Sequence, residues 1–287
     1  MMEDFLHSYN TFRENGVENP LLETLRLFDL LSCGLLRATD LSLLRQEHVG
    51  LSQFVQMRKE GLPMEYIIGR ATFMGNMFFC TPDTLIPTEE SDLLVKTAAD
   101  LIRKRQEREN IFTVVEVGTG CGNIAVSLAM NSKDTRILAS DISPAAIEIA
   151  KKNVSHYCLQ DRISLFSGDL FAPFHSMTGK IDMVVCNPPY IPTGSLDKLP
   201  PEIIDHEPRI ALDGGPYGID LFRRLISGSL EVLRPKGILV FEIGERQEKL
   251  VARLFEKNKG YEDIEYFRHD EIIRVIGAVK TGNEVGR

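Results

Sequence analysis

The sequence from Val114 to Ala129, VVEVGTGCGNIAVSLA, decides the fold. A mostly apolar run is followed by Gly118, Gly120 and Gly122, and then by apolar residues at helical spacing. Glycine is needed where a turn is tight and where a ligand lies directly on the backbone. We therefore predict a buried strand, a ligand-binding turn and an amphipathic helix, which begin a doubly wound α/β domain.

The residues around this turn indicate a nucleoside ligand. Asp141 ends the next apolar strand, where a carboxylate can accept hydrogen bonds from both ribose hydroxyls. Asn123 stands where a GxGxxG dinucleotide fingerprint would have its third glycine, which disfavours NAD. Glu116 would face a positively charged amino group, or be a solvated strand-end acid. Asp169 and Leu170 would hold an adenine ring, although core packing is an alternative for Leu170. The neighbours predicted to complete the cofactor site are Thr119, Cys121 and Ile142.

Strand, turn and helix alternate through the rest of the chain, which is typical of a mostly parallel sheet with helices on both faces. A helix is expected at residues 90–105. The predicted strands are 113–117, 135–140, 163–166, 181–186, 237–243, 264–267 and 272–279.

The first part of the chain predicts a small helical domain. Asn19 followed by Pro20 is a good helix start, because proline tolerates the first helical position. Apolar residues then recur at helical spacing, at Leu21, Leu22, Leu25, Phe28, Leu31, Leu41, Leu44, Phe54, Val55 and Met57. No chemistry is recognisable there, so we expect a packing or partner-docking module.

A hairpin is expected between this module and the α/β domain. Residues 72–80, TFMGNMFFC, alternate as two short strands around Gly75 and Asn76. The predicted division is a helical domain at 1–62, a hairpin linker at 63–88 and a catalytic domain at 89–287.

The strand at 181–186 ends in Asn187-Pro188-Pro189-Tyr190, which we predict to be the catalytic site. Two prolines fix the backbone and leave carbonyls free to accept hydrogen bonds, which suits a substrate NH2 group. The Asn187 side-chain oxygen and the Pro188 carbonyl would accept its two hydrogens, and Tyr190 would stack on the flat acceptor. The alternative is a rigid proline turn with Tyr190 in the core.

Composition excludes several classes of function. A formal net charge of −8 argues against affinity built mainly on phosphate neutralisation. The five cysteines form no CxxC pair and the six histidines no metal-binding spacing, so we expect no metal and a reducing compartment. With no basic-apolar leader and no long apolar run, the expectation is a cytoplasmic protein without a membrane span.

These motifs resemble the HemK/PrmC family, the peptide-chain release factor N5-glutamine methyltransferases. The resemblance covers nearly the whole chain, in PMEYIIGRATFMG, LIPTEES, EVGTGCG, SDISPAAIEIAKKN, CNPPYIP, EPRIALDGGPYGIDLFRRLI and GILVFEIGERQ. It implies a class I methyltransferase, Rossmann-like, with a mostly parallel seven-stranded sheet, and S-adenosylmethionine as the methyl donor. It also implies that Asn187 contacts the cofactor, and that a release factor glutamine is the acceptor. We expect a monomer that forms no stable complex with nucleic acid.

One departure and three alternatives remain open. The family usually has arginine and proline where this chain has Thr88 and Glu89. An adenine-N6 nucleic-acid methyltransferase presents nearly the same conjugated NH2 group to such a turn, but it must flip a base and hold phosphates. A ribosomal-protein glutamine methyltransferase and a non-catalytic S-adenosylmethionine-binding module are the others.

Overall fold

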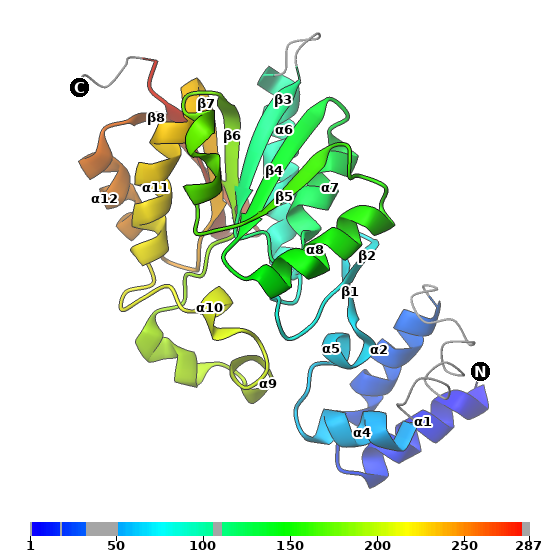
Figure 1. The fold of residues 1–287 in the computed structure, drawn as a ribbon. Coiled ribbons are helices and arrows are strands. Elements are labelled where there is room, and N and C mark those ends of the chain that lie inside the picture. Colours follow the sequence, from blue (N-terminus) through cyan, green and yellow to red (C-terminus); the bar gives the residue numbers. More distant parts are fainter. Residues whose placement is uncertain (1, 18, 33–50, 106–110, 283–287) are drawn as a thin grey trace. The chain divides into compact units, whose positions relative to one another are not determined.

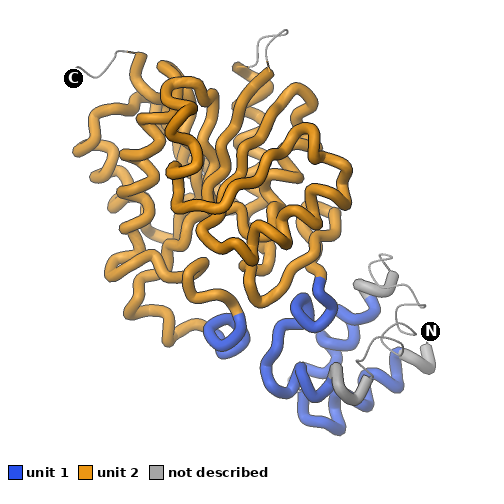
Figure 2. The backbone as a smooth tube through the Cα atoms, in the orientation of Figure 1, with its two compact units in different colours: residues 1–69, 200–206 blue, residues 70–199, 207–287 orange. Residues whose placement is uncertain are grey.

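A computed structural model describes residues 2–17, 19–32, 51–105 and 111–282. The chain divides into two compact units, which Figure 2 shows in blue and orange. The smaller unit comprises residues 1–69 and 200–206, and the larger one residues 70–199 and 207–287. The predicted domain boundaries at 62 and 88 stay a prediction, since compactness does not establish where folding units end.

The larger unit contains a seven-stranded sheet in the order β5-β4-β3-β6-β7-β9-β8 (Figure 1). Its strands are β3 (Phe112–Val117), β4 (Thr135–Asp141), β5 (Ile163–Ser167), β6 (Ile181–Cys186), β7 (Leu233–Glu242), β8 (Tyr261–His269) and β9 (Ile272–Lys280). The pairs from β5 to β7 are parallel, and β9 runs antiparallel to both β7 and β8. The predicted mostly parallel sheet of seven strands is therefore confirmed.

The strand order changes direction between β3 and β6. From β3 the chain continues to β4 and β5 on one side, and from β6 it continues to β7 on the other. In open α/β sheets, ligands bind beyond the carboxyl ends of the strands at such a point. The glycine turn follows β3 and the NPPY sequence follows β6, so the topology brings the two predicted motifs to one edge of the sheet.

Helices cover both faces of this sheet (Figure 1). On one face α6 (Asp92–Arg105), α7 (Asn123–Asn131) and α8 (Pro144–His156) bury residues in a first apolar cluster. On the other, α11 (Asp220–Val232) and α12 (Glu248–Asn258) bury residues in a second. Short helices complete the unit, namely η1 (Glu89–Ser91), η2 (Ala172–Met177), η3 (Thr193–Lys198) and α10 (Arg209–Leu212). The strands contribute alternate side chains to the two clusters, as a central sheet must.

Two strands are longer than the sequence predicts. Strand β7 begins at Leu233 rather than at Gly237, and its pairing with β6 shifts register after Ile181. Pro235 and Gly237 between those points are typical of a turn, so the local sequence hides the first pairing. Strand β8 extends beyond 264–267 in both directions, with irregular register against β9.

The predicted hairpin is present as β1 (Arg70–Phe73) and β2 (Asn76–Phe79). Its turn lies at Met74 and Gly75, one residue earlier than predicted. Asn153 of α8 is fully buried and fixes this hairpin, because its side chain accepts from Phe79 N at 2.7 Å and donates to Phe79 O at 2.9 Å. The same amide also donates to the Cys121 carbonyl at 2.7 Å, so one side chain ties the hairpin to the glycine turn.

The smaller unit is helical, as predicted. It contains α1 (Met2–Glu14), α2 (Pro20–Ser32), α4 (Leu51–Lys59), α5 (Met64–Ile68) and α9 (Pro201–Ile204). Its core is built from Phe12, Val17, Leu27, Val55 and Met64. Arg58 pairs with Glu23 and Glu202 at 2.8 Å each, which ties α4 to α2 and to α9.

The apolar stripe predicted along the first helices is wrong in part. Helix α2 begins at Pro20 as expected, but Leu21, Leu22 and Leu25 are about half exposed. The buried face of α2 is instead Glu23, Thr24 and Leu27, because the ion pair to Arg58 draws Glu23 inward. The spacing of apolar residues does not reveal that a charged residue will be buried by an ion pair. Leu41 and Leu44 lie outside the described residues.

Candidate functional site

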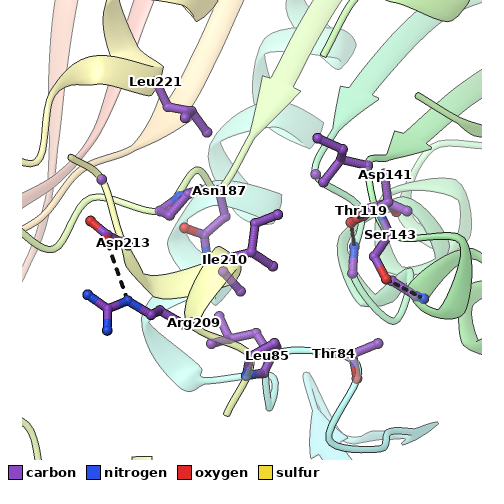
Figure 3. Close-up of a pocket in the computed structure, with 18 of the residues that line it drawn as sticks. Thr84, Leu85, Thr119, Asp141, Ser143, Asn187, Arg209, Ile210, Asp213 and Leu221 are labelled. Carbon is purple, nitrogen blue, oxygen red and sulfur yellow. Dashed lines mark hydrogen bonds and ion pairs between the residues drawn. The ribbon is translucent and has the colours of Figure 1, made fainter. Parts of the chain in front are cut away.

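A cavity of about 670 Å³ lies at the carboxyl ends of β3, β4 and β6, and it has the size of a small-molecule or cofactor site. Figure 3 shows Asp141, Thr119 and Ser143 along one side of it, with Asn187 and Ile210 between them and Leu221. Of the residues predicted to form the site, Gly118, Thr119, Gly120, Cys121, Asp141, Ile142, Asp169, Leu170, Asn187 and Pro189 line this cavity, whereas Glu116, Gly122, Pro188 and Tyr190 do not.

The glycine turn is held open by its backbone conformation. Gly118, Gly120 and Gly122 have φ of 73°, 55° and 83°, a region that side chains with a Cβ rarely adopt. The amides of Gly118 and Thr119 donate to the Ser140 carbonyl at 2.8 and 2.9 Å, which fixes the turn to the end of β4. Backbone is thereby presented to the cavity with no side chain in the way, as a ligand lying on the turn requires.

Asp141 is fixed in place by two backbone amides. Gly120 N donates to one carboxylate oxygen at 2.8 Å, and Ser143 N donates to the other at 2.9 Å. Burial raises the pKa of this carboxyl, while the backbone amides of Ser143, Gly120 and Ile142 lower it. A carboxylate oxygen has two lone pairs, so each oxygen keeps one for a further donor from the cavity. This is the geometry needed to accept two hydroxyl hydrogens.

Glu116 is the last residue but one of β3. Its exposure is 2%, so it is not a solvated strand-end acid. Thr119 Oγ1 donates to one of its carboxylate oxygens at 2.8 Å. In the described part of the chain the other oxygen has no hydrogen-bond partner. Burial, together with repulsion from Asp141, raises its pKa to about 8 despite the hydrogen bond from Thr119 and the nearby backbone amide of Ala125. A buried acid with an unpartnered oxygen fits a cationic ligand group.

The predicted adenine contacts, Asp169 and Leu170, follow β5 and line the cavity. Asp169 forms an ion pair with Arg224 of α11 at 2.6 Å, so its carboxylate is shared between that arginine and the cavity. Leu170 has a φ of 46° and its carbonyl accepts from Ser140 Oγ at 3.1 Å. Ile142 is 51% exposed and lines the cavity.

Asn187 begins a chain of buried hydrogen bonds. Its side-chain Nδ2 donates to Ser91 Oγ at 2.9 Å, and Ser91 Oγ donates to Glu242 Oε2 at 2.7 Å. The Tyr190 hydroxyl donates to the other Glu242 oxygen at 3.2 Å. Ser91 and Glu242 are almost fully buried, at 2% and 1% exposure. The NPPY turn is therefore held by side chains from η1 and β7.

The backbone of the same turn is clamped from a second direction. Gln247 Nε2 donates to the Tyr190 carbonyl at 2.8 Å, and Gly244 N donates to Gln247 Oε1 at 2.8 Å. A Cβ on Gly214 would lie 2.8 Å from Tyr190 Cα, and one on Gly218 would lie 2.2 Å from Tyr190 O. The two glycines are thus required by close approach of the loop after α10. Asp213, at the start of that loop, forms an ion pair with Arg209 of α10, which Figure 3 shows.

Three residues of this site were not predicted from the sequence, namely Ser91, Glu242 and Gln247. They are far from NPPY along the chain, and only the topology brings them together. For Glu242 and Gln247 the available signal is the glutamate that ends the apolar run GILVF and the glutamine five residues later in FEIGERQ, whereas Ser91 has no such local signal. The prediction that Tyr190 stacks on the acceptor stays a prediction, because its hydroxyl and part of its ring pack against β7 and the second cluster.

Two further properties concern the described residues alone. They contain no group of three or more His, Cys, Asp or Glu side chains that could hold a metal ion. None of their helices is both long and apolar enough to cross a membrane.

Comparisons with known proteins agree with this geometry. The family model "Methyltransferase small domain" matches residues 91–215. The fold is similar to the catalytic domain of hMettl16 in complex with MAT2A 3′UTR hairpin 6, with a TM-score of 0.57 and 16% identity over 72% of this chain and 76% of that chain. A likeness at that identity shows the fold alone. The sheet order, the glycine turn and the matching family model define a class I methyltransferase, and the chain is an enzyme of that class.

Curated relatives narrow this class. A release factor glutamine methyltransferase of Moorella thermoacetica is 38% identical, over 83% of both chains. One of Clostridium acetobutylicum is also 38% identical, over 80% of this chain and 79% of the relative. The chain belongs to the release factor glutamine methyltransferase family, which confirms the resemblance drawn from its motifs.

Proposed function

We propose that this enzyme transfers a methyl group from S-adenosylmethionine to the side-chain nitrogen of the glutamine in the Gly-Gly-Gln sequence of a peptide-chain release factor. The observation that carries the proposal is one cavity with the ribose-type acceptor Asp141 and the amide Asn187 both in its wall. The names of the relatives from Moorella thermoacetica and Clostridium acetobutylicum support the choice of acceptor.

The residues around the glycine turn fit the methyl donor. Asp141 would accept from the ribose hydroxyls, the glycine backbone would lie against the amino-acid part, and the charge of Glu116, which is buried next to the cavity wall, would balance its ammonium group. Asp169, Leu170 and Ile142 would enclose the adenine. When bound, S-adenosylmethionine supplies an electrophilic methyl group on a positively charged sulfur, whose leaving group is neutral.

Asn187 and its neighbours would prepare the acceptor. An amide nitrogen is a weak nucleophile because its lone pair is delocalised, so orientation has to lower the barrier. The Asn187 Oδ1 and the Pro188 carbonyl would accept the two hydrogens of the substrate NH2 and aim its nitrogen at the methyl group. Proximity and orientation can supply about 7 to 11 kcal/mol in favourable cases. No strong base is needed, since the nitrogen can lose its proton late.

The glycines of the acceptor also suit this cavity. The walls next to Asn187 are rigid, because Gly214 and Gly218 already touch the NPPY backbone. A peptide that enters beside such walls needs residues without side chains on either side of its glutamine.

Methyl transfer from labelled S-adenosylmethionine to three acceptors tests the proposal. The acceptors are a purified release factor, its Gln→Ala variant in the Gly-Gly-Gln sequence, and adenine-containing nucleic acid. We expect label on the release factor and none on the other two. Label on nucleic acid alone would replace the proposal by base methylation.

A further inference from the structure

Glu242 lies outside the cavity, yet it is joined to Asn187 through a single hydroxyl. Ser91 Oγ is 2.7 Å from Glu242 Oε2 and 2.9 Å from Asn187 Nδ2. All three side chains are at least half-buried, and Ser91 and Glu242 are almost inaccessible to water. Each polar group in this chain therefore has to find its partner within the protein.

The directions of these hydrogen bonds follow from the chemistry of the groups. An ionised carboxylate can only accept, and a serine hydroxyl has one hydrogen to donate. Once that hydrogen is given to Glu242, Ser91 Oγ can only accept from Asn187. The end of the Asn187 amide that faces Ser91 must then be its NH2, and its oxygen Oδ1 must face the other way.

The second oxygen of Glu242 restrains the same turn at its other end. It accepts from the Tyr190 hydroxyl at 3.2 Å, so one carboxylate holds both the first and the last residue of NPPY. A glutamine in place of Glu242 would offer an NH2 as well as an oxygen. It could then reverse the Ser91 hydroxyl and release the Asn187 amide to rotate.

We propose that Glu242 is a positioning residue for methyl transfer, which acts through Ser91 to keep the Asn187 oxygen directed at the acceptor nitrogen. This inference rests on the proposed role of Asn187 in binding the acceptor NH2. Glu242 touches neither acceptor nor methyl donor, and its contribution is the polarity of an amide two hydrogen bonds away.

The ionisation of Glu242 gives this role a readout. Burial raises its pKa to about 7, with the hydrogen bonds from Ser91 and Tyr190 and the charge of Arg274 acting against burial, and the charge of Glu90 adding to it. Arg274 and Glu90 are themselves an ion pair, and burial, together with charges that include Glu242, raises the pKa of the Cys186 thiol. Below that pH, a protonated Glu242 gains a hydrogen to donate, and Ser91 is no longer forced to accept from Asn187.

The expected pH effect is therefore a loss of turnover on the acid side. With both substrates saturating, kcat should rise as the pH increases through about 7 and then level off. Saturation matters because it removes the separate effect of Glu116 on cofactor binding.

The experiment compares kcat of the wild type, Glu242→Gln, Ser91→Ala and Ser91→Thr on the release factor from about pH 6 to about pH 9, a range that spans the raised pKa of Glu242 of about 7. Ser127→Ala is the matched control, because Ser127 is a buried serine of α7 whose hydroxyl has no partner among the described residues. Cofactor affinity is measured for each variant by calorimetry.

We expect Glu242→Gln and Ser91→Ala to lower kcat about tenfold to hundredfold, as for a small misplacement of a reacting group, with cofactor affinity unchanged. Ser91→Thr keeps the hydroxyl and should restore most of the turnover, and Ser127→Ala should match the wild type. In Glu242→Gln, kcat should also no longer fall as the pH decreases below about 7.

The inference is overturned if Ser91→Ala retains the kcat of Ser127→Ala, which decides the question even if Glu242→Gln does not fold. It is also overturned if kcat of Glu242→Gln still falls below about pH 7 as in the wild type. A wild type that transfers no methyl group to the release factor would instead overturn the proposed function, and that result is seen before any variant is compared.

Discussion

The two halves of the cavity are built in different ways. The half around Asp141 is a short stretch of backbone, in which glycines at positive φ expose the main chain and two amides fix one carboxylate. The half around Asn187 is an assembly of side chains from η1, the NPPY turn and the end of β7. On the proposed function, a local stretch of backbone would bind the ligand, whereas a network from distant segments would set the direction of one amide.

This difference implies that binding and transfer can be separated by mutation. Changes near Asp141 should alter cofactor affinity with turnover at saturation preserved. Changes near Asn187 should do the reverse. Measurements of cofactor affinity and turnover in variants of each half would either sharpen that separation or show that it does not exist.

The largest effect is expected for Asn187→Ala. Loss of an orienting hydrogen bond in a closed site costs about 3 kcal/mol, so kcat should fall about a hundredfold or more. Cofactor affinity, measured by calorimetry, should stay measurable. Asn131→Ala is the control, because Asn131 is exposed at the end of α7 and does not line the cavity. Equal turnover of the two variants would contradict the role of Asn187.

Asp141→Ala should act on the other half. A hydrogen bond to a charged group contributes about 1.5 to 3 kcal/mol, so the loss of one such bond alone should weaken cofactor affinity by about tenfold to hundredfold. Turnover at saturating cofactor should stay close to that of Asp161→Ala, a change at an exposed aspartate outside the cavity. Normal affinity would place the ribose contact elsewhere.

Glu116→Gln should change how cofactor affinity depends on pH. The raised pKa of about 8 means that Glu116 is largely protonated below pH 8 in the free protein, and it must lose that proton to pair with an ammonium group. Wild-type affinity should therefore increase from pH 6 to 8, by up to about tenfold per pH unit. The variant should lack that increase, and parallel profiles would exclude an ion pair at Glu116.

The same acid should lower stability as the pH rises. Its pKa of about 8 in the folded protein lies above its ordinary value of 4.5, so the folded state binds the proton more tightly. The ligand-free protein should lose free energy of unfolding between about pH 4.5 and 8, as measured by denaturant titration. Glu116→Gln should flatten this part of the stability curve, and an unchanged slope would assign it to other groups.

The smallest difference is expected between two glycine substitutions. Gly122 and Gly75 have φ of 83° and 72°, so alanine at either should cost about 1 to 2 kcal/mol in backbone strain. A Cβ at Gly122 would also meet Ala150 Cβ at 3.2 Å, whereas one at Gly75 would meet nothing within 4 Å. Gly122→Ala should be the less stable of the two in denaturant unfolding. Equal stability of the two variants would contradict this expectation and would show that α8 moves to make room.

The difference between the two halves also explains what could be predicted from the sequence. Gly118, Asp141 and the apolar strands are local signals, because glycine, a strand-end acid and hydrophobic periodicity each have a local cause. The ranges of most strands and the residues expected on the cofactor side of the cavity follow from them. NPPY could be recognised for the same reason, since two prolines restrict the chain where they stand.

The support of NPPY could not be predicted in this way. Glu242 and Ser91 are separated by most of the catalytic unit in sequence, and their contact depends on which strands become neighbours. The prediction of the buried face of α2 was wrong for a related reason, because Glu23 is buried by its ion pair with Arg58 rather than by apolar character. Long-range polar contacts leave no periodic pattern in a sequence.

The most direct test of the account is to locate the transferred methyl group. The release factor is incubated with the enzyme and S-adenosylmethionine, digested, and analysed by fragmentation mass spectrometry, with Asn187→Ala in parallel. The account predicts one methyl group on the side-chain nitrogen of the glutamine in Gly-Gly-Gln, present with the wild type and nearly absent with the variant. A methyl group on another residue, or equal modification by both enzymes, would contradict it.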